Sequence, residues 1–186
     1  ILGDNAMKSI DRIEVVTMDH FEQIEDWCQV FAPDLVTKIK PVEVDDGSRD
    51  LALFEHRDVL GQIESLFHNY ILLPSGGSII IQETAALTAI DVNTGSDKRG
   101  HLSTNIESAK EIGRQIRLRN TGGIVIIDFL KVKKSEQKEL LDALTSITFS
   151  DPCTVQIHGF TNLGLMEISR KRRSAPLQER LESIEF

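Results

Sequence analysis

The order of apolar and polar positions predicts short strands alternating with amphipathic helices. A strand is expected over residues 10–16, which are rich in Ile and Val, and a helix should follow from Asp19 as its N-cap to Phe31. The polar, acidic stretch 40–50 contains proline and glycine and predicts a linker. Apolar residues at helical spacing then predict a second helix over residues 55–69.

Two apolar runs with a glycine-rich connection predict a β-hairpin in the middle of the chain. The strands are expected at Tyr70–Leu73 and Ser78–Ile81, with the Pro-Ser-Gly-Gly sequence of residues 74–77 as the turn. A Ser-Gly-Gly turn can also cradle a phosphate group. Because turn residues are common and this motif is short, the pattern favours a plain hairpin turn.

The segment from residue 87 to residue 129 carries the clearest pattern. Leu87–Val92 and Ile124–Phe129 are both apolar and predict buried strands. Thr104 and Glu107 form a capping box, which predicts that the intervening helix begins there and ends at the Asn-Thr-Gly-Gly sequence of residues 120–123. A strand, helix, strand order predicts a parallel pair joined by a right-handed crossover. Strands that are apolar throughout are typical of a sheet covered on both faces.

The rest of the chain continues the same alternation. A helix is expected over residues 135–147, a strand over residues 154–158 and a last helix after Pro176. The predicted fold class is therefore α/β, with a mixed sheet built on a parallel βαβ core, helices on its faces, and a small α/β segment before it.

Each strand of the predicted parallel pair has an aspartate at its carboxyl end. Asp91 follows Leu-Thr-Ala-Ile, and Asp128 follows Ile-Val-Ile-Ile. Because parallel strands point the same way, both carboxylates should emerge at one edge of the sheet, where ligands bind in open α/β proteins. Asn93 lies two residues beyond Asp91 and would project from the same face.

Two anions that close together repel each other, and a divalent cation between them would relieve the repulsion. Mg²⁺ commonly takes one or two carboxylates and keeps its other positions for water and phosphate. The competing interpretation is that Asp91 and Asp128 each cap a turn at the end of a strand, because aspartate is common in turns. The residues alone support these two interpretations about equally.

Charge is distributed unevenly along the chain. The net charge is −8, yet residues 1–90 hold 6 basic and 16 acidic residues (−10), whereas residues 91–186 hold 15 and 13 (+2). Only the second half is therefore suited to phosphate contact. Its candidates lie in three basic clusters: Arg114, Arg117 and Arg119; Lys131, Lys133 and Lys134; and Arg170, Lys171, Arg172 and Arg173.

Other features of the composition narrow the class of protein. Cys28 and Cys153 lie in no zinc-binding spacing, so no zinc site is predicted, and two buried thiols are expected instead. No apolar run is long enough to span a membrane, and no signal peptide is visible. A cytoplasmic protein with no membrane partner is the expectation.

An ordered series of motifs resembles the catalytic core of the ribonuclease E/G family. The resemblance runs over roughly residues 55–173, and more loosely over residues 8–50. The motifs are Leu-Pro-Ser-Gly-Gly at 73–77, Leu-Thr-Ala-Ile-Asp-Val-Asn-Thr-Gly at 87–95, the segment 105–119 with its Ile-Arg-Leu-Arg ending, Gly-Gly-Ile-Val-Ile-Ile-Asp-Phe at 122–129, and Gly-Leu-Met-Glu-Ile-Ser-Arg-Lys-Arg at 164–172.

The resemblance implies a division of the chain and an activity. Residues 1–50 would be part of an RNase H-like segment, residues 51–173 a DNase I-like catalytic subdomain, and residues 174–186 a C-terminal helix or tail. It implies Mg²⁺-dependent cleavage of single-stranded RNA to 5′-phosphate and 3′-hydroxyl ends, with Mn²⁺ as an alternative ion. The metal-binding aspartates of the family fall on Asp91 and Asp128, and its assisting asparagine falls on Asn93.

The predicted RNA contacts combine the resemblance with the basic clusters. They are Arg114, Arg117, Lys131, Arg170, Lys171 and Arg172. For each of these side chains, a solvated charged surface is the competing interpretation.

The resemblance also implies an S1 domain and a sensor of the RNA 5′ end ahead of the core, and a cysteine-rich zinc link after it. None of these is expected within the present residues, so a homo-oligomer is left open rather than predicted. The alternative function is a non-catalytic module of the same fold that binds RNA or a protein partner.

Overall fold

The computed structural model describes residues 10–44, 51–172 and 174–182, and they form the predicted mixed α/β fold. The predicted linker falls partly on residues 45–50, which lie outside the described residues. The chain divides into two compact units, one up to Glu64 and one from Ser65 onward.

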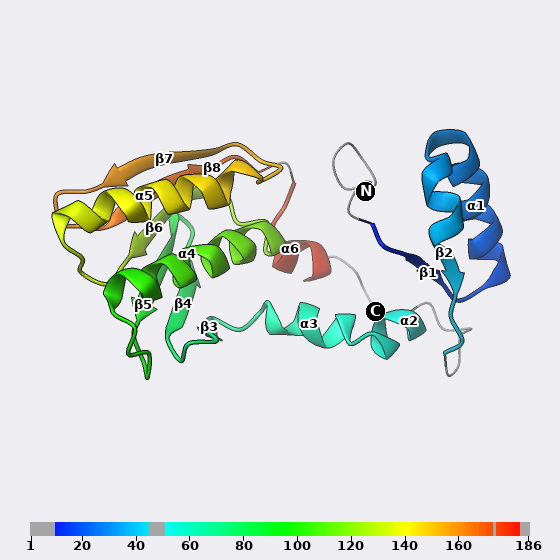
Figure 1. Cartoon of the computed structure of the whole chain (residues 1–186), viewed down its shortest axis with the longest axis horizontal. Coiled ribbons are helices and arrows are strands. Elements are labelled where there is room, and N and C mark those ends of the chain that lie inside the picture. Colours follow the sequence, from blue (N-terminus) through cyan, green and yellow to red (C-terminus); the bar gives the residue numbers. More distant parts are fainter. Residues whose placement is uncertain (1–9, 45–50, 173, 183–186) are drawn as a thin grey trace. The chain divides into compact units, whose positions relative to one another are not determined.

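The N-terminal unit is a small α/β element with its own core. Strand β1 (Ile13–Val15) pairs in parallel with β2 (Ile39–Pro41), and between them lie helix α1 (Met18–Phe31) and a 3-10 helix (Pro33–Lys38) (Figure 1). The buried residues of its core are Val15, Cys28, Ala32, Leu35 and Ile39.

Two helix predictions in this unit need correction. The N-cap of α1 is Thr17 rather than Asp19, because the Thr17 hydroxyl accepts a hydrogen bond from the backbone N–H of His20 at 3.2 Å. The single helix expected over residues 55–69 is divided into α2 (Ala52–His56) and α3 (Val59–Ser65). Asp58 lies between them with a φ of 53°, a left-handed conformation that a continuous α-helix does not accommodate.

The C-terminal unit is built on a six-stranded sheet with the strand order β3-β4-β5-β6-β8-β7. Its first three strands, β3 (Tyr70–Leu72), β4 (Ser78–Glu83) and β5 (Leu87–Asn93), form an antiparallel meander. The predicted hairpin is thus confirmed. Strands β5 and β6 (Gly123–Asp128) are parallel and are joined by helix α4 (His101–Leu118), so the predicted βαβ core is also confirmed.

The remaining elements complete the sheet and its cover. Helix α5 (Lys134–Phe149) leads to β7 (Val155–Phe160), which turns back as β8 (Met166–Arg170) and inserts beside β6. Helix α6 (Leu177–Glu182) follows. None of the helices within the described ranges is long and apolar enough to cross a membrane.

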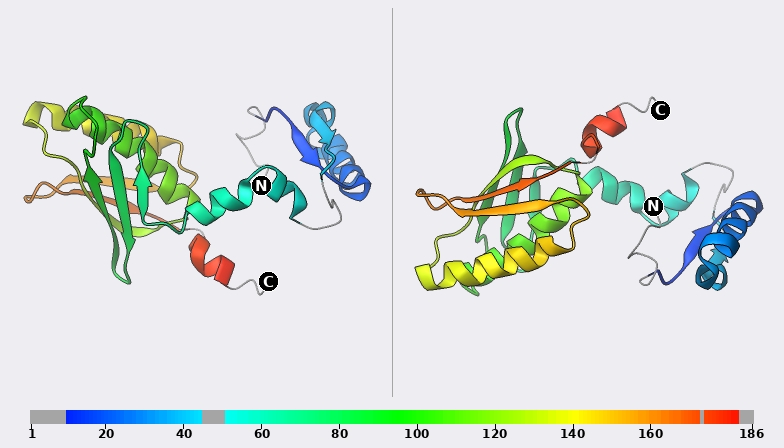
Figure 2. Two further views of the ribbon diagram at one scale, coloured as in Figure 1. Left: turned by 90° about the horizontal axis from the view of Figure 1, so that it is seen from below. Right: turned by 90° about the horizontal axis from the view of Figure 1, so that it is seen from above.

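Helices α4 and α5 lie on one side of the sheet (Figure 2). Side chains of β5 and β6 therefore alternate: Ile90 and Ile127 are fully buried beneath the helices, whereas Ile124 on the other face is 45% exposed. This corrects the expectation that both strands are covered on both faces. The second face of the sheet, here called the open face, remains accessible in the described chain.

Candidate metal and nucleic-acid site

Asp91 and Asp128 lie side by side at the carboxyl ends of the parallel strands. They are register partners across β5 and β6. Neighbouring strands are about 4.8 Å apart, and partners in register project from the same face. Both side chains are exposed on the open face, because their sequence neighbours Ile90 and Ile127 point into the core. The structure therefore brings these two carboxylates together, while their role as ligands stays a prediction.

Asn93 belongs to the same constellation. It lies two residues beyond Asp91 on β5 and is exposed on the same face. Its side-chain amide donates a hydrogen bond to the Asp91 carboxylate, from Nδ2 to Oδ2, at 2.8 Å. This bond orients one carboxylate and leaves the Asn93 amide oxygen available to another donor.

Helix α4 holds the loop that follows Asp128. Asn105 is fully buried, and its side-chain amide forms two hydrogen bonds with the backbone of Leu130. Nδ2 donates to the Leu130 carbonyl at 2.8 Å, and Oδ1 accepts from the Leu130 N–H at 3.0 Å. Next to it, the Nδ1 atom of His101 lies 2.8 Å from the carbonyl oxygen of Lys131. The backbone just past β6 is thus fixed to the first turns of α4.

A second network holds the loop that follows Asn93. Asp97 accepts hydrogen bonds from the Arg99 guanidinium at 2.9 Å and from the Thr104 hydroxyl at 2.8 Å. The Arg99 contacts, together with Ser75 and Thr104, hold the pKa of Asp97 far below its usual range, although burial opposes the shift. Arg99 also forms an ion pair with Glu107. The pKa of Glu107 is lowered, most strongly by a hydrogen bond from Ser75.

This network corrects the predicted capping box. Helix α4 begins at His101 with Gly100 as its N-cap, so Thr104 lies one turn inside the helix. The Thr104 hydroxyl donates to Asp97 and, at 3.2 Å, to the carbonyl of Gly100, and the Glu107 carboxylate pairs with Arg99, so these two residues do not form the predicted capping box.

The Ser-Gly-Gly turn packs against the same loop. The N–H of Ser96 donates to the carbonyl of Gly76 at 3.0 Å. A Cβ atom at Gly95 would lie only 2.2 Å from that carbonyl oxygen, so glycine is required there for the close approach. The turn therefore acts as a hairpin connection that supports the loop beyond Asn93.

The residues predicted to contact RNA separate into two groups. Lys131 is exposed three positions beyond Asp128, at the same end of the sheet. Arg114 and Arg117 lie on α4, about 20 Å and 24 Å along the helix from His101 at 1.5 Å per residue. Arg114 is further engaged by Glu111 at 2.8 Å. The α4 pair is therefore distant from the carboxylates.

Arg170 has a different role from the predicted one. Its side chain is 1% exposed and forms an ion pair at 2.9 Å with the equally buried Asp151. It also donates to the carbonyl of Thr121 at 2.7 Å. No guanidinium surface is left for a phosphate, so Arg170 is not part of the proposed RNA interface. Lys171 and Arg172, the next two residues, are exposed.

The donor set fits a hard divalent cation. Within residues 10–44, 51–172 and 174–182, no three His, Cys, Asp or Glu side chains form a metal-binding group. A site at Asp91 and Asp128 would therefore rest on two carboxylates, with water or phosphate oxygens in the other positions, as Mg²⁺ accepts.

Sequence reasoning missed the residues that position this site. Asn105 shares the buried face of α4 with Ala109, Ile112 and Ile116, at spacings of four, seven and eleven residues. A polar residue in such a row signals a buried hydrogen bond, and this signal was available in the sequence. The partners of Asp97 could not be found in this way.

A model of the ribonuclease E/G family matches residues 1–173. The chain belongs to the ribonuclease E/G family.

The relatives are bacterial ribonucleases that are much longer than this chain. It is 36% identical to ribonuclease E of Haemophilus influenzae over 185 residues, which are 96% of this chain and 19% of that protein. It is 40% identical to ribonuclease E of Escherichia coli over 79% of this chain and 14% of that protein. It is 34% identical to ribonuclease G of Salmonella typhimurium over 92% of this chain and 36% of that protein. The chain thus spans well under half of these relatives.

Proposed function

We propose that this chain carries the catalytic centre of a Mg²⁺-dependent endoribonuclease that cleaves single-stranded RNA to 5′-phosphate and 3′-hydroxyl ends. The observation that carries the proposal is the in-register pair of Asp91 and Asp128, with Asn93 bonded to Asp91. In this proposal residues 51–173 correspond to a DNase I-like catalytic subdomain and residues 1–50 to part of an RNase H-like one.

Each side chain has a distinct task in the proposed reaction. Asp91 and Asp128 would hold the ion, which when bound would supply Lewis acidity at the scissile phosphate and a water of lowered pKa. Asn93 holds Asp91 in place by its amide and accepts or donates one further hydrogen bond at the phosphate. The clamp of Asn105 on Leu130 keeps the strand end that carries Asp128 from moving.

Exposed lysines at the same end of the sheet would draw the RNA backbone to the carboxylates. Lys131, Lys133 and Lys134 all follow β6 and are exposed. Contacts of this kind are electrostatic and independent of base sequence, so binding should weaken steeply as salt is raised.

The proposal is tested by incubating the purified chain with a 5′-labelled single-stranded RNA in Mg²⁺ or in EDTA. We expect slow cleavage that requires Mg²⁺, is lost in Asp128→Asn, and leaves 5′-phosphate ends that a ligase accepts. Asp142→Asn is the matched control, because Asp142 is an exposed aspartate on α5.

RNA binding without cleavage at any Mg²⁺ or Mn²⁺ concentration would favour the alternative function, a non-catalytic module. Cleavage by Asp128→Asn at the wild-type rate would reject the assignment of the site.

A further inference from the structure

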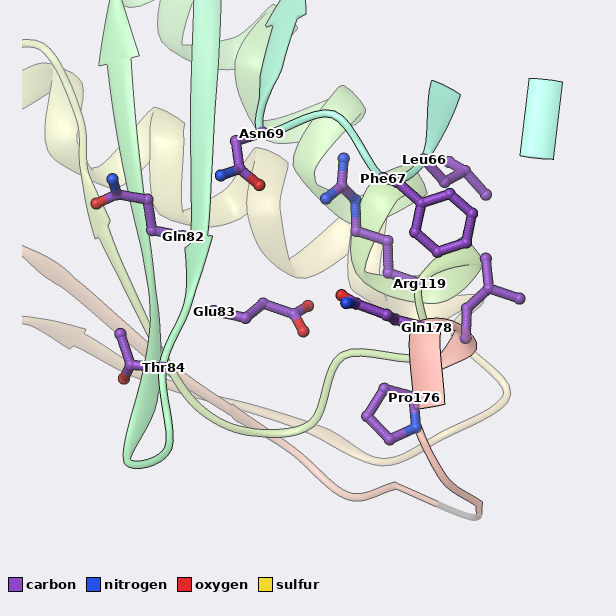
Figure 3. Close-up of a pocket in the computed structure, with 10 residues that line it drawn as sticks. Leu66, Phe67, Asn69, Gln82, Glu83, Thr84, Arg119, Pro176 and Gln178 are labelled. Carbon is purple, nitrogen blue, oxygen red and sulfur yellow. The ribbon is translucent and has the colours of Figure 1, made fainter. Parts of the chain in front are cut away.

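A polar pocket lies at the other end of β4, away from the carboxylate pair. It has a volume of about 510 Å³. Its walls come from the segment after α3, the end of β4, the end of α4 and the start of α6 (Figure 3). Its lining includes Phe67, Asn69, Gln82, Glu83, Arg119 and Gln178.

The pocket combines an aromatic wall with groups that form hydrogen bonds. The Phe67 side chain is 41% exposed, a large accessible area for an aromatic ring. Figure 3 shows Glu83 extending from β4 toward Gln178, with Phe67 and Arg119 across the pocket. Asn69 and Gln82 also line the pocket.

Both charged groups of the pocket are held by other residues. The Glu83 carboxylate accepts a hydrogen bond through Oε1 from the buried Thr121 hydroxyl at 2.7 Å. The Arg119 guanidinium donates to Gln115 Oε1 at 2.8 Å and to the His68 carbonyl at 2.7 Å. These bonds fix the side chains before any ligand arrives, which lowers the entropy cost of binding.

The electrostatics of the pocket suit a neutral ligand with a polar edge. Burial lowers the pKa of Arg119, and the charges of Glu83 and Glu111 partly oppose this. A guanidinium so poorly hydrated gains more from a carbonyl acceptor than one in water does. With one acid and one base lining the pocket, a charged ligand has no net attraction there.

We propose that this pocket binds a guanine base. Guanine is the one RNA base that offers two adjacent N–H donors, N1–H and N2–H, on one edge, and a carboxylate such as Glu83 accepts from both. Adenine and cytosine place a ring nitrogen acceptor beside their single amino group, and uracil flanks its N–H with two carbonyl oxygens. Each of these three bases would set an acceptor against the acceptor-only carboxylate. The ring of Phe67 supplies the stacking surface on which single-stranded bases are commonly held.

This inference rests on the proposed function, because it treats the ligand as a base of the RNA substrate. Glu83 pairs with Thr88, three residues before Asp91 on β5. At about 3.3 Å per residue Glu83 lies roughly 10 Å along the strand from the carboxylates, and this odd spacing places its side chain on the opposite face of the sheet, the face that α4 and α5 cover. A guanosine bound there would lie away from the cleaved bond, so the pocket would give the enzyme a preference for RNA that carries a guanosine outside the cleavage site.

The experiment titrates the 186-residue chain with GMP, AMP, CMP and UMP in EDTA, with amide NMR shifts as the readout. Ribose 5-phosphate serves as the control for phosphate binding. We expect saturable GMP binding, at least tenfold tighter than binding of the other three nucleotides, with shifts at residues 67–69 and 82–84. Glu83→Gln should reduce the GMP preference at least tenfold, because one acceptor oxygen becomes an N–H₂ donor. Glu139→Gln on α5 is its matched control.

Phe67→Ala should weaken binding of all four nucleotides, and Phe149→Ala, at a residue that is 90% exposed outside the pocket, should not. The Phe67 variant also keeps the test decisive should Glu83→Gln fail to fold. Equal affinity for the four nucleotides, no saturable binding, or GMP shifts away from the pocket would each overturn the proposal. The nucleotide titration contains no Mg²⁺, so its result does not depend on cleavage. A chain that binds GMP in the pocket but cleaves no RNA in the separate Mg²⁺ assay would refute the proposed function and leave the guanine pocket standing.

Discussion

Replacing Asp128 with Asn should raise the stability of the metal-free protein and remove its response to Mg²⁺. Asp128 and Asp91 are partners in register on parallel strands and are both exposed. Two unit charges about 5 Å apart in a mostly aqueous setting repel by roughly 1 kcal/mol. The amide keeps the size of the carboxylate and removes the repulsion. Without metal, Asp128→Asn should therefore be more stable than wild type by up to about 1 kcal/mol.

Binding of Mg²⁺ should make wild type more stable than Asp128→Asn. An ion that binds only the folded state at ten times its dissociation constant stabilises the protein by about 1.4 kcal/mol. For a chain of this length that corresponds to a rise in Tm of roughly 3–6 °C. A neutral amide is a poorer ligand for a hard cation, so the variant should show little of this rise.

The assay is a set of thermal melts, with and without Mg²⁺, on wild type, Asp128→Asn and the control Asp142→Asn. The control should follow wild type in both conditions, because Asp142 lies on α5 rather than on the open face. The reasoning would be refuted if millimolar Mg²⁺ left the Tm of wild type unchanged, or if it raised the Tm of Asp128→Asn as much as that of wild type. A destabilised Asp128→Asn in EDTA would instead support a turn-capping role for this residue.

Two further outcomes are expected from the ionic contacts of the C-terminal unit. Arg170→Ala should lower the free energy of unfolding by about 3–5 kcal/mol, because it leaves the buried Asp151 carboxylate unpaired. Lys171→Ala, the control, should change it by no more than about 0.5 kcal/mol. Urea unfolding midpoints compare the two variants, and equal midpoints would contradict the buried ion pair. The pKa of Asp97 is depressed in the folded state by Arg99. The ionised carboxylate therefore stabilises the folded protein above the unfolded-state pKa of about 4, and this stabilisation is lost as the pH falls below that value. Between about pH 4 and pH 2, the urea midpoint of Asp97→Asn should therefore fall less than that of wild type. If the midpoints of the two proteins fell in parallel with pH, Asp97 would not be stabilised as a carboxylate by Arg99.

The elements closest to the candidate site were predictable because their signals are local. Apolar runs at Leu87–Val92 and Ile124–Phe129 with a helical segment between them leave few arrangements besides a βαβ unit. Since that unit is parallel, the position of Asp91 and Asp128 at one edge followed from the strand ends alone. The turn at residues 74–77 and the helix end near Asn120 were equally local, because each depends on residues that accept a left-handed backbone.

Pairings between distant segments were decided only by the tertiary structure. Strand β8 pairs with β6 and so separates it from β7, an order that the periodicity of each strand does not contain. The buried pair of Arg170 with Asp151 turned an apparent phosphate contact into part of the core, because the exposure of a charge depends on whether a partner reaches it.

The sequence by itself thus determined the family, the βαβ unit and the two strand-end carboxylates, all through patterns within a few residues or through ordered motifs. Tertiary structure decided what surrounds them. Asn105 reaches Leu130 across 25 positions, and Thr121 reaches Glu83 across 38. Hydrogen bonds over such separations carry no periodic signal, because they form only after packing has brought the elements together, and they are what fix the site and line the pocket.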